Sequence, residues 1–191
     1  MSRVVRLRGG PRAGAAGRPR WWWPGGGGSA ASTGAAARGG EWPRRGAGLG
    51  PGGIARAAHG LADEVARGLR SNGRGVYGSR VAVLAGAGNN GGDALYAVAS
   101  LAHDGATATV LAVAESVHEG GLRAAREAGA LVLNGVGVHA DSAAEISSAL
   151  SSADLVIDGI VGIGGRPGLS AEIETLLREV SDSAYVLAVD L

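Results

Sequence analysis

A glycine-rich segment with polar side chains, Gly86-Ala87-Gly88-Asn89-Asn90-Gly91-Gly92-Asp93, is the first candidate for chemistry in this chain. It contains the spacing G-x-G-x-x-G, in which backbone amides and the N-terminus of a following helix can hold a pyrophosphate. Its two side-chain amides and its carboxylate also offer oxygen atoms suited to a hard cation or to hydroxyl groups. The alternative is purely structural: Asn and Gly supply the geometry of a tight turn, and Asp93 caps the next helix.

Two further carboxylates follow apolar runs that are typical of buried strands. Asp158 comes directly after residues 155–157, and Asp190 comes directly after residues 185–189. Ligands of open α/β sheets bind outside the carboxyl ends of the strands, so both carboxylates are expected near the glycine-rich segment. Each could instead be a strand-end carboxylate that caps the following loop.

The apolar pattern predicts the elements that position these residues. A helix is expected from Ile54 to Leu69, because apolar residues recur there every three or four positions and Asn72-Gly73 follows as a stop signal. Strands are expected at 80–85, 107–113, 130–133, 155–157 and 185–189, and helices at 93–103, 119–128, 142–150 and 170–180. This alternation predicts an α/β fold, a three-layer Rossmann-like sandwich around a mainly parallel, doubly wound sheet whose last strand is exposed at an edge.

Composition divides the chain near Gly53. Residues 1–52 carry nine arginines, one acid and all four tryptophans without helical or strand periodicity, so a disordered basic Gly/Pro/Arg-rich extension is expected there. A nucleic-acid or membrane-surface arm is the alternative interpretation of this segment, since arginine attracts phosphates. Residues 53–191 form the expected domain. No apolar run reaches the roughly 18 residues that span a bilayer, and no cysteine is present. We expect a bacterial cytoplasmic protein that binds neither nucleic acid nor membrane.

Three segments together resemble one known family. Residues 86–93 are similar to the G-x-G-N-N-G-G-D signature of the NAD(P)H-hydrate epimerase family, also called the YjeF N-terminal domain family. Residues 154–164 resemble its D-x-x-x-D-[AG]-x-x-G-x-G segment, and residues 188–191 match the opening of its V-D-[IL]-P-S-G motif. The resemblance covers roughly residues 54–191.

The resemblance implies a repair enzyme, an isomerase that interconverts the R and S epimers of hydrated NADH and NADPH for use by a separate NAD(P)H-hydrate dehydratase. It implies potassium as cofactor, with Asn90 and Asp158 as metal ligands, and Asp190 as the catalytic acid–base residue, because epimerisation needs a hydroxyl protonated as it leaves and a water deprotonated as it returns. The implied substrate-binding residues are Asn89, Asn90, Gly91, Gly92, Asp93, Gly162, Ile163, Gly164, Gly165, Arg166, Pro167, Gly168 and Asp190. The resemblance also allows a homodimer.

Two other functions stay open at this point. The chain ends at Leu191, before the Pro-Ser-Gly of the family's third motif, so the domain is expected to be incomplete at its C-terminus and could be a catalytically incomplete nucleotide- or partner-binding module. A dinucleotide-dependent oxidoreductase would use G-x-G-x-x-G with an acid near the end of the second strand, where Glu115 stands. The four histidines share no spacing that would suit a metal and are expected at the surface.

Overall fold

The computed structural model describes residues 3–7, 51–136, 141, 143–160 and 169–190. In chain order the elements are β1 (Arg3–Leu7), α1 (Pro51–Ser71), β2 (Arg80–Ala85), α2 (Asn89–His103), β3 (Thr107–Ala112), α3 (Glu119–Glu127), β4 (Leu131–Asn134), α4 (Ala143–Ser151), β5 (Leu155–Gly159), α5 (Ala171–Arg178) and β6 (Tyr185–Asp190). The strands form one sheet in the order β1-β6-β5-β2-β3-β4, parallel throughout except for β1 against β6. The predicted Rossmann-like α/β class is confirmed.

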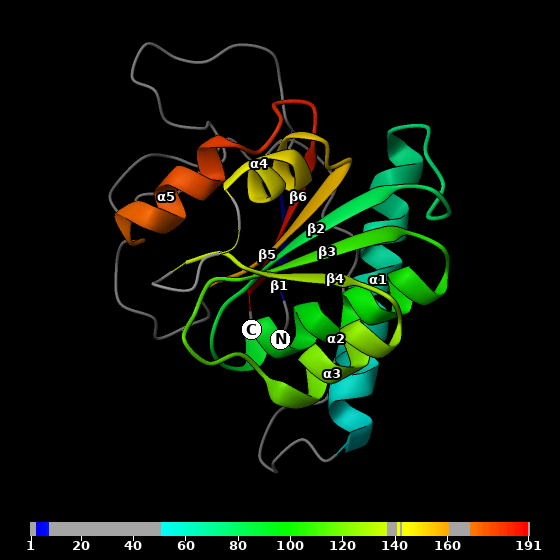
Figure 1. Ribbon diagram of the computed structural model, residues 1–191. Helices are drawn as coiled ribbons and strands as arrows, with labels where there is room; N and C mark the ends of the chain where they lie inside the picture. Colours follow the sequence, from blue (N-terminus) through cyan, green and yellow to red (C-terminus); the bar gives the residue numbers. More distant parts are fainter. Residues whose placement is uncertain (1–2, 8–50, 137–140, 142, 161–168, 191) are drawn as a thin grey trace, which may run out of the picture.

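Helices cover both faces of this sheet (Figure 1). Helices α1, α2 and α3 pack on one face and α4 and α5 on the other. Along β2, Val81, Val83 and Ala85 belong to the core beneath the first three helices, whereas Ala82 and Leu84 belong to the core beneath the last two. Because side chains alternate between faces along a strand, a strand buried on both sides must be apolar at every position.

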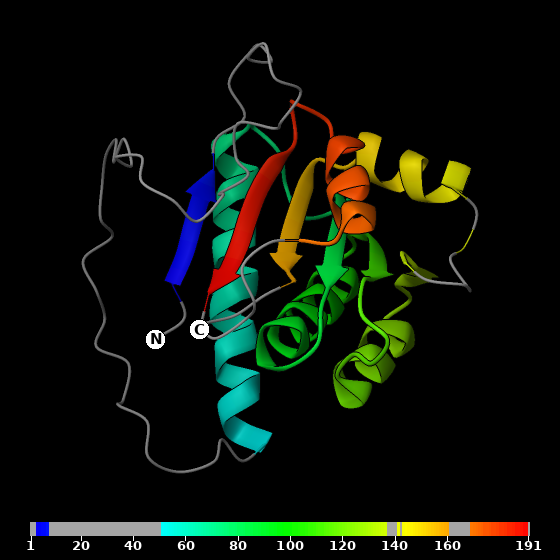
Figure 2. The same ribbon diagram turned by 90° about the vertical axis from the view of Figure 1, so that its left-hand side faces the viewer.

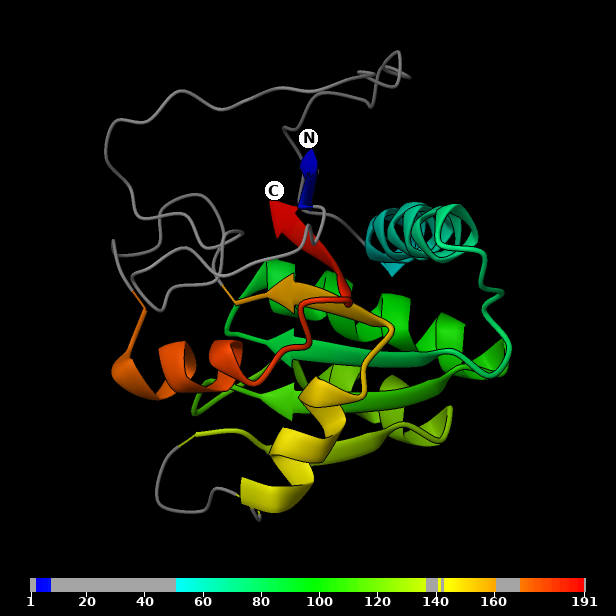
Figure 3. The ribbon, with the colours of Figure 1, turned by 90° about the horizontal axis from the view of Figure 1, so that it is seen from above.

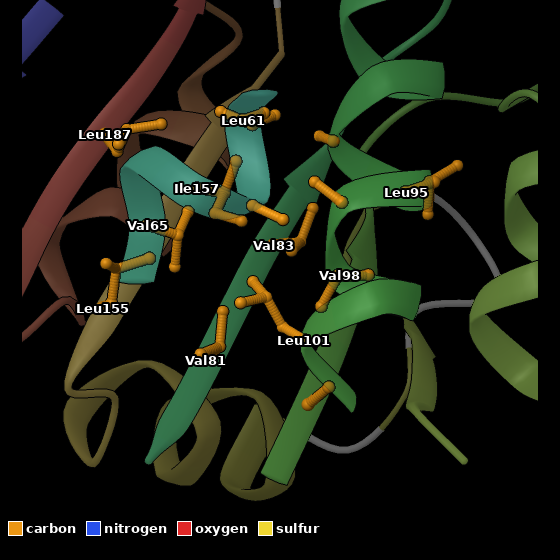
Figure 4. Close-up of a cluster of buried hydrophobic side chains, with 14 of the residues drawn as sticks. Leu61, Val65, Val81, Val83, Leu95, Val98, Leu101, Leu155, Ile157 and Leu187 are labelled. Atoms are coloured by element: carbon orange, nitrogen blue, oxygen red, sulfur yellow. The ribbon is translucent and has the colours of Figure 1, made fainter. Parts of the chain in front are cut away.

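The larger core lies between the sheet and helices α1 and α2 (Figure 4). Leu61 and Val65 of α1 and Leu95 and Val98 of α2 are all buried, each on one apolar helix face. This is the face that the three-to-four-residue spacing predicts for the first helix. Burying a Leu or Val side chain contributes about 1.5–3 kcal/mol to stability. Helices α1 and α2 are therefore held against the sheet mainly by the burial of these side chains.

Helix α1 ends where the Asn72-Gly73 signal predicts. Gly73 has a φ of 73°, the Arg74 N–H donates to the Leu69 carbonyl at 3.0 Å, and the Gly73 N–H donates to the Arg70 carbonyl at 3.0 Å. This pair of hydrogen bonds is the Schellman motif, which needs a left-handed residue after the helix and therefore favours glycine. Helices α2 and α3 end in the same way, at Gly105 and Gly129.

The N-terminal strand differs from expectation. Arg3–Leu7 lies in the segment predicted to be disordered, yet it pairs antiparallel with β6 (Figure 2). In this pairing Arg3 lies opposite Asp190. The expectation that the last strand is a sheet edge is therefore wrong, since β6 lies between β1 and β5. This strand has only five residues and pairs with a strand at the other end of the chain. Its sequence therefore contains no repeating pattern of apolar residues by which it could be predicted. Residues 8–50 lie outside the described part of the chain.

Asp154 joins the amino ends of three strands. Its carboxylate accepts the Arg80 N–H at 2.8 Å and lies 3.3 Å from the Arg74 guanidinium, and its backbone carbonyl accepts the Tyr185 N–H at 3.0 Å. The side chain is only 7% exposed, whereas both arginine side chains are more than half exposed. Among the described residues no helix has the length and apolar character needed to cross a membrane.

The first prediction concerns this carboxylate. Asp154→Ala should lower the free energy of unfolding by about 1–3 kcal/mol, because it leaves the Arg80 N–H without its acceptor. Urea unfolding measures the change. Asp182→Ala, at an exposed position near the same end of β6, is the matched control and should stay within about 0.5 kcal/mol of the unaltered chain. Equal effects of the two changes would show that the carboxylate adds nothing to stability.

Candidate functional site

The candidate site lies where the order of the strands reverses. From β2 the chain proceeds outward through β3 and β4, and it then returns to place β5 and β6 on the other side of β2. The carboxyl ends of β2 and β5 point to the same edge (Figure 3). Such a switch point in an open α/β sheet is where ligands bind, because the two connections leave in opposite directions and the loops separate above it.

Glycine allows the segments after β2 and β5 to approach closely. The Gly86 N–H donates to the Gly159 carbonyl at 3.1 Å, and a Cβ atom on Gly86 would lie 2.0 Å from the Ile160 carbonyl oxygen. A Cβ atom on Gly91 would lie 2.0 Å from the Gly86 carbonyl oxygen. No side chain fits at either position, so this part of the motif is required by packing before any ligand is considered.

The polar part of the motif is helical. Helix α2 begins at Asn89, four residues before the predicted start, with Gly88 as N-cap at a φ of 86°. The Gly92 N–H already donates to the Gly88 carbonyl at 3.1 Å. The suggestion that Asp93 caps this helix is therefore wrong, and Asp93 is instead 8% exposed within it. The prediction placed the start too late because Asn and Gly are poor helix formers, and here packing overrides that propensity.

Asn90 links the first turn of α2 to the last strand. Its side chain is 3% exposed, and its Nδ2 donates to the Val189 carbonyl at 2.7 Å. Val189 directly precedes Asp190, so one hydrogen bond joins the glycine-rich motif to the strand that carries the third predicted site residue. Neighbouring Asn89 is exposed, whereas Gly91 and Gly92 are buried.

Asp158 lies within β5, although the sequence predicts that the strand ends before it. It is paired with Leu84 of β2 and Ala188 of β6, and its Oδ1 accepts the Ile160 N–H at 3.1 Å. Burial raises the pKa of the Asp158 carboxyl above its ordinary value, and the hydrogen bond from Ile160 opposes part of that rise. An ionised carboxylate here is costly unless a cation compensates it.

Several predicted site residues fall outside the described part of the chain. Asp190 is the last residue of β6, and the structure describes its backbone but not its side chain. Outside the described residues altogether lie Gly162, Ile163, Gly164, Gly165, Arg166, Pro167 and Gly168. The described residues contain no group of three or more His, Cys, Asp or Glu side chains that could hold a metal ion.

His118 is next to the motif, although the sequence predicted a surface residue. Its half-buried ring lies against Gly92, where an added Cβ atom would be 3.1 Å from Cγ, and its Nδ1 accepts the Gly121 N–H at 3.0 Å. The Tyr96 ring of α2 meets it edge-on at 5.6 Å between centroids. The signal that could have identified His118 is its position as N-cap, directly before Glu119 in the first turn of a helix.

Comparisons with known proteins agree on this region. The family model described as YjeF-related protein N-terminus matches residues 54–191. The chain is 39% identical over 140 residues to the Bifunctional NAD(P)H-hydrate repair enzyme Nnr of Mycobacterium leprae, covering 72% of this chain and 27% of that protein. It is 39% identical over 141 residues to the NAD(P)H-hydrate epimerase of Microbacterium testaceum, covering 71% and 50%. The chain thus spans between about a quarter and a half of these relatives.

Among solved structures, the yeast protein ynu0 has the same fold. The superposition has a TM-score of 0.57 at 21% identity and covers 74% of this chain and 63% of that one.

The second prediction tests the close approach of the first turn of α2 to the Gly86 backbone at the end of β2. Gly91→Ala should destabilise the chain by about 1–3 kcal/mol or more, because the Gly86 carbonyl occupies the place of the new methyl group. In an ordinary helix the same change would stabilise by up to about 1 kcal/mol. Gly75→Ala is the control, since nothing lies within 4 Å of its Cβ position. Thermal unfolding compares the two, and a stabilised Gly91→Ala variant would contradict the packing argument.

The third prediction concerns pH. The folded Asp158 carboxyl has a pKa above its ordinary value of 3.8, so folding stability falls as the pH rises through 3.8 toward the folded pKa. Asp158→Asn keeps an acceptor for the Ile160 N–H and removes the charge. In buffer without potassium it should raise the urea midpoint at neutral pH and leave it unchanged at a pH well below 3.8. A variant less stable than the unaltered chain at neutral pH would overturn this expectation.

Proposed function

This chain belongs to the family of the YjeF-related protein N-terminus, and from that premise we propose that it interconverts the R and S epimers of hydrated NADH and NADPH. The observation that carries the proposal is the hydrogen bond from Asn90 Nδ2 to the Val189 carbonyl. This bond connects the glycine-rich motif, which is proposed to hold the ligand, to the end of β6, which is proposed to carry the catalytic carboxylate. A motif that served only as a turn would not need a buried amide directed at a strand 99 residues away.

Asp190 is the proposed acid–base residue. Epimerisation breaks the bond between the ring carbon and its hydroxyl oxygen, which leaves as water after protonation, while the ring nitrogen delocalises the positive charge. Water then adds to the other face and returns one proton. A carboxyl group at the end of β6 can give the first proton as acid and accept the second as base. In its ionised form it also stabilises the cation between the two steps.

The first turn of α2 is proposed to receive the phosphates. The N-terminus of a helix carries unpaired N–H groups and a partial positive charge. Gly88 is exposed at the N-cap and supplies no side chain for capping, so an anion can approach these amides. The segment 162–168, which the resemblance places on the phosphate side, would complete this surface with further glycine amides.

Asn90 and Asp158 are proposed to hold a potassium ion. The donor set fits, because an amide oxygen and a carboxylate are hard oxygen ligands. The raised pKa of Asp158 supports the same assignment, since a nearby cation would favour the ionised form that burial disfavours. Bound there, the ion would supply a fixed positive charge that orders these two side chains.

The product has a defined use. If a dehydratase accepts only one epimer, an epimerase makes the other epimer available to it. The relatives named as bifunctional repair enzymes support a functional partnership of this kind. We propose that this chain supplies its product to an NAD(P)H-hydrate dehydratase.

The fourth prediction is a coupled assay. A mixture of R and S NADPH hydrate is treated with an S-specific dehydratase, and the reaction beyond the S portion is followed with and without this chain. The chain should accelerate that phase above spontaneous epimerisation, and Asp190→Asn should reduce the acceleration by about 10²- to 10⁴-fold. Asp182→Asn, at an exposed position before the same strand, should leave the rate unchanged. A folded chain without acceleration would refute the proposal and favour a nucleotide-binding module.

A further inference from the structure

Helices α2 and α3 meet through an unusually close set of residues, Gly92 on α2 with His118, Gly120 and Gly121 at the start of α3. We call this set the α2–α3 contact. An added Cβ on Gly121 would lie 2.8 Å from the Leu95 Cβ, and one on Gly120 would lie 2.7 Å from the Tyr96 hydroxyl oxygen. The two helices therefore touch by backbone as well as by side chains, and their first turns cannot move independently.

The His118 side chain has a defined protonation pattern in this contact. Its Nδ1 accepts the Gly121 N–H at 3.0 Å, so Nδ1 carries no proton and the neutral ring carries its proton on Nε2. The backbone of His118 is extended, with a φ of −62° and a ψ of 106°, as an N-cap residue requires. The cap thus fixes the direction in which the imidazole points.

The ring is directed onto the motif. The three heavy atoms nearest to a Cβ on Gly92 are all from His118, namely Cγ at 3.1 Å, Cδ2 at 3.2 Å and Cβ at 3.3 Å. Gly92 is two residues from Asn90 in the same helical turn, and Asn90 in turn holds the Val189 carbonyl at 2.7 Å. A continuous series of contacts therefore leads from the His118 ring to the backbone that precedes Asp190.

We propose that His118 is a positioning residue for the epimerase reaction, which fixes the first turn of α2 and through it Asn90 and the end of β6. This inference rests on the proposed function. The role depends on Nδ1, which accepts the Gly121 N–H at 3.0 Å and so fixes the ring against Gly92.

Two substitutions of His118 separate its roles. Asparagine reproduces Cβ and Cγ and offers Oδ1 as acceptor where Nδ1 stands, whereas alanine loses both the cap and the ring. In the coupled assay at neutral pH, His118→Ala should lower kcat by up to about a hundredfold with little change in KM, as expected for misplaced catalytic groups. His118→Asn should keep most of the activity.

The matched control is His103→Ala, an exposed histidine at the far end of α2, which should behave like the unaltered chain. Hydrogen exchange gives a readout that does not depend on activity. The amide of Gly92, whose N–H donates to the Gly88 carbonyl at 3.1 Å, should exchange faster in His118→Ala than in His118→Asn. If the unaltered chain has no epimerase activity, the proposed function fails while this exchange comparison still decides the positioning role.

The proposal is overturned if alanine and asparagine reduce kcat equally, or if exchange in the first turn of α2 is the same in both variants. If the alanine variant does not fold, His118→Asn decides alone. A folded asparagine variant that loses most of the activity would then refute positioning through the cap bond.

Discussion

The structure depends on one close approach, that of the backbones after β2 and β5. Gly86 donates to the Gly159 carbonyl, and the places of the missing side chains at Gly86 and Gly91 are occupied by carbonyl oxygens 2.0 Å away. Since no rotamer change can relieve a clash between backbones, glycine at these positions is a condition of the fold. Helix α2 can therefore begin above the switch point, with its N-terminus at the edge where β5 and β6 end. The exposed residues Gly88 and Asn89 at the start of this helix are where a ligand can approach it.

Two polar groups, buried Asn90 and partly buried Asp158, follow from this arrangement, and they differ in their cost to stability. Asn90 is stabilised, because its Nδ2 donates to the Val189 carbonyl and joins two elements that are distant in sequence. The charge of the Asp158 carboxylate is less well stabilised by its surroundings, and burial raises the pKa of the carboxyl group. A group that lowers stability in its ionised form is more readily explained by a ligand than by folding. This contrast supports the proposed cation between the two side chains, and it makes stability and function separable at Asp158.

Much of the fold could be predicted from local pattern. The strands from β2 to β6 and the helices between them were expected within a few residues, because a parallel sheet buried on both faces imposes continuous apolar runs and its helices show one apolar face. The errors have physical causes. Helix α2 begins four residues early because tertiary packing outweighs the poor propensity of Asn and Gly, and β1 gains its stability from pairing with β6 at the opposite end of the chain. The contact of His118 with the motif was not predicted, because its partners, Gly92 and Tyr96, lie on a neighbouring helix.

The sequence by itself determined the class of fold, the order of the parallel strands along the chain and the residue types of the candidate site, since periodicity and the G-x-G-N-N-G-G-D motif are local properties of the chain. Only the tertiary structure decided which of those residues are joined. The Asn90 bond to Val189, the raised pKa of Asp158 and the contact of His118 with Gly92 each depend on groups that are brought together by the sheet. Hydrogen bonding and desolvation act over a few ångströms in space, and spacing along a chain does not specify such distances between elements.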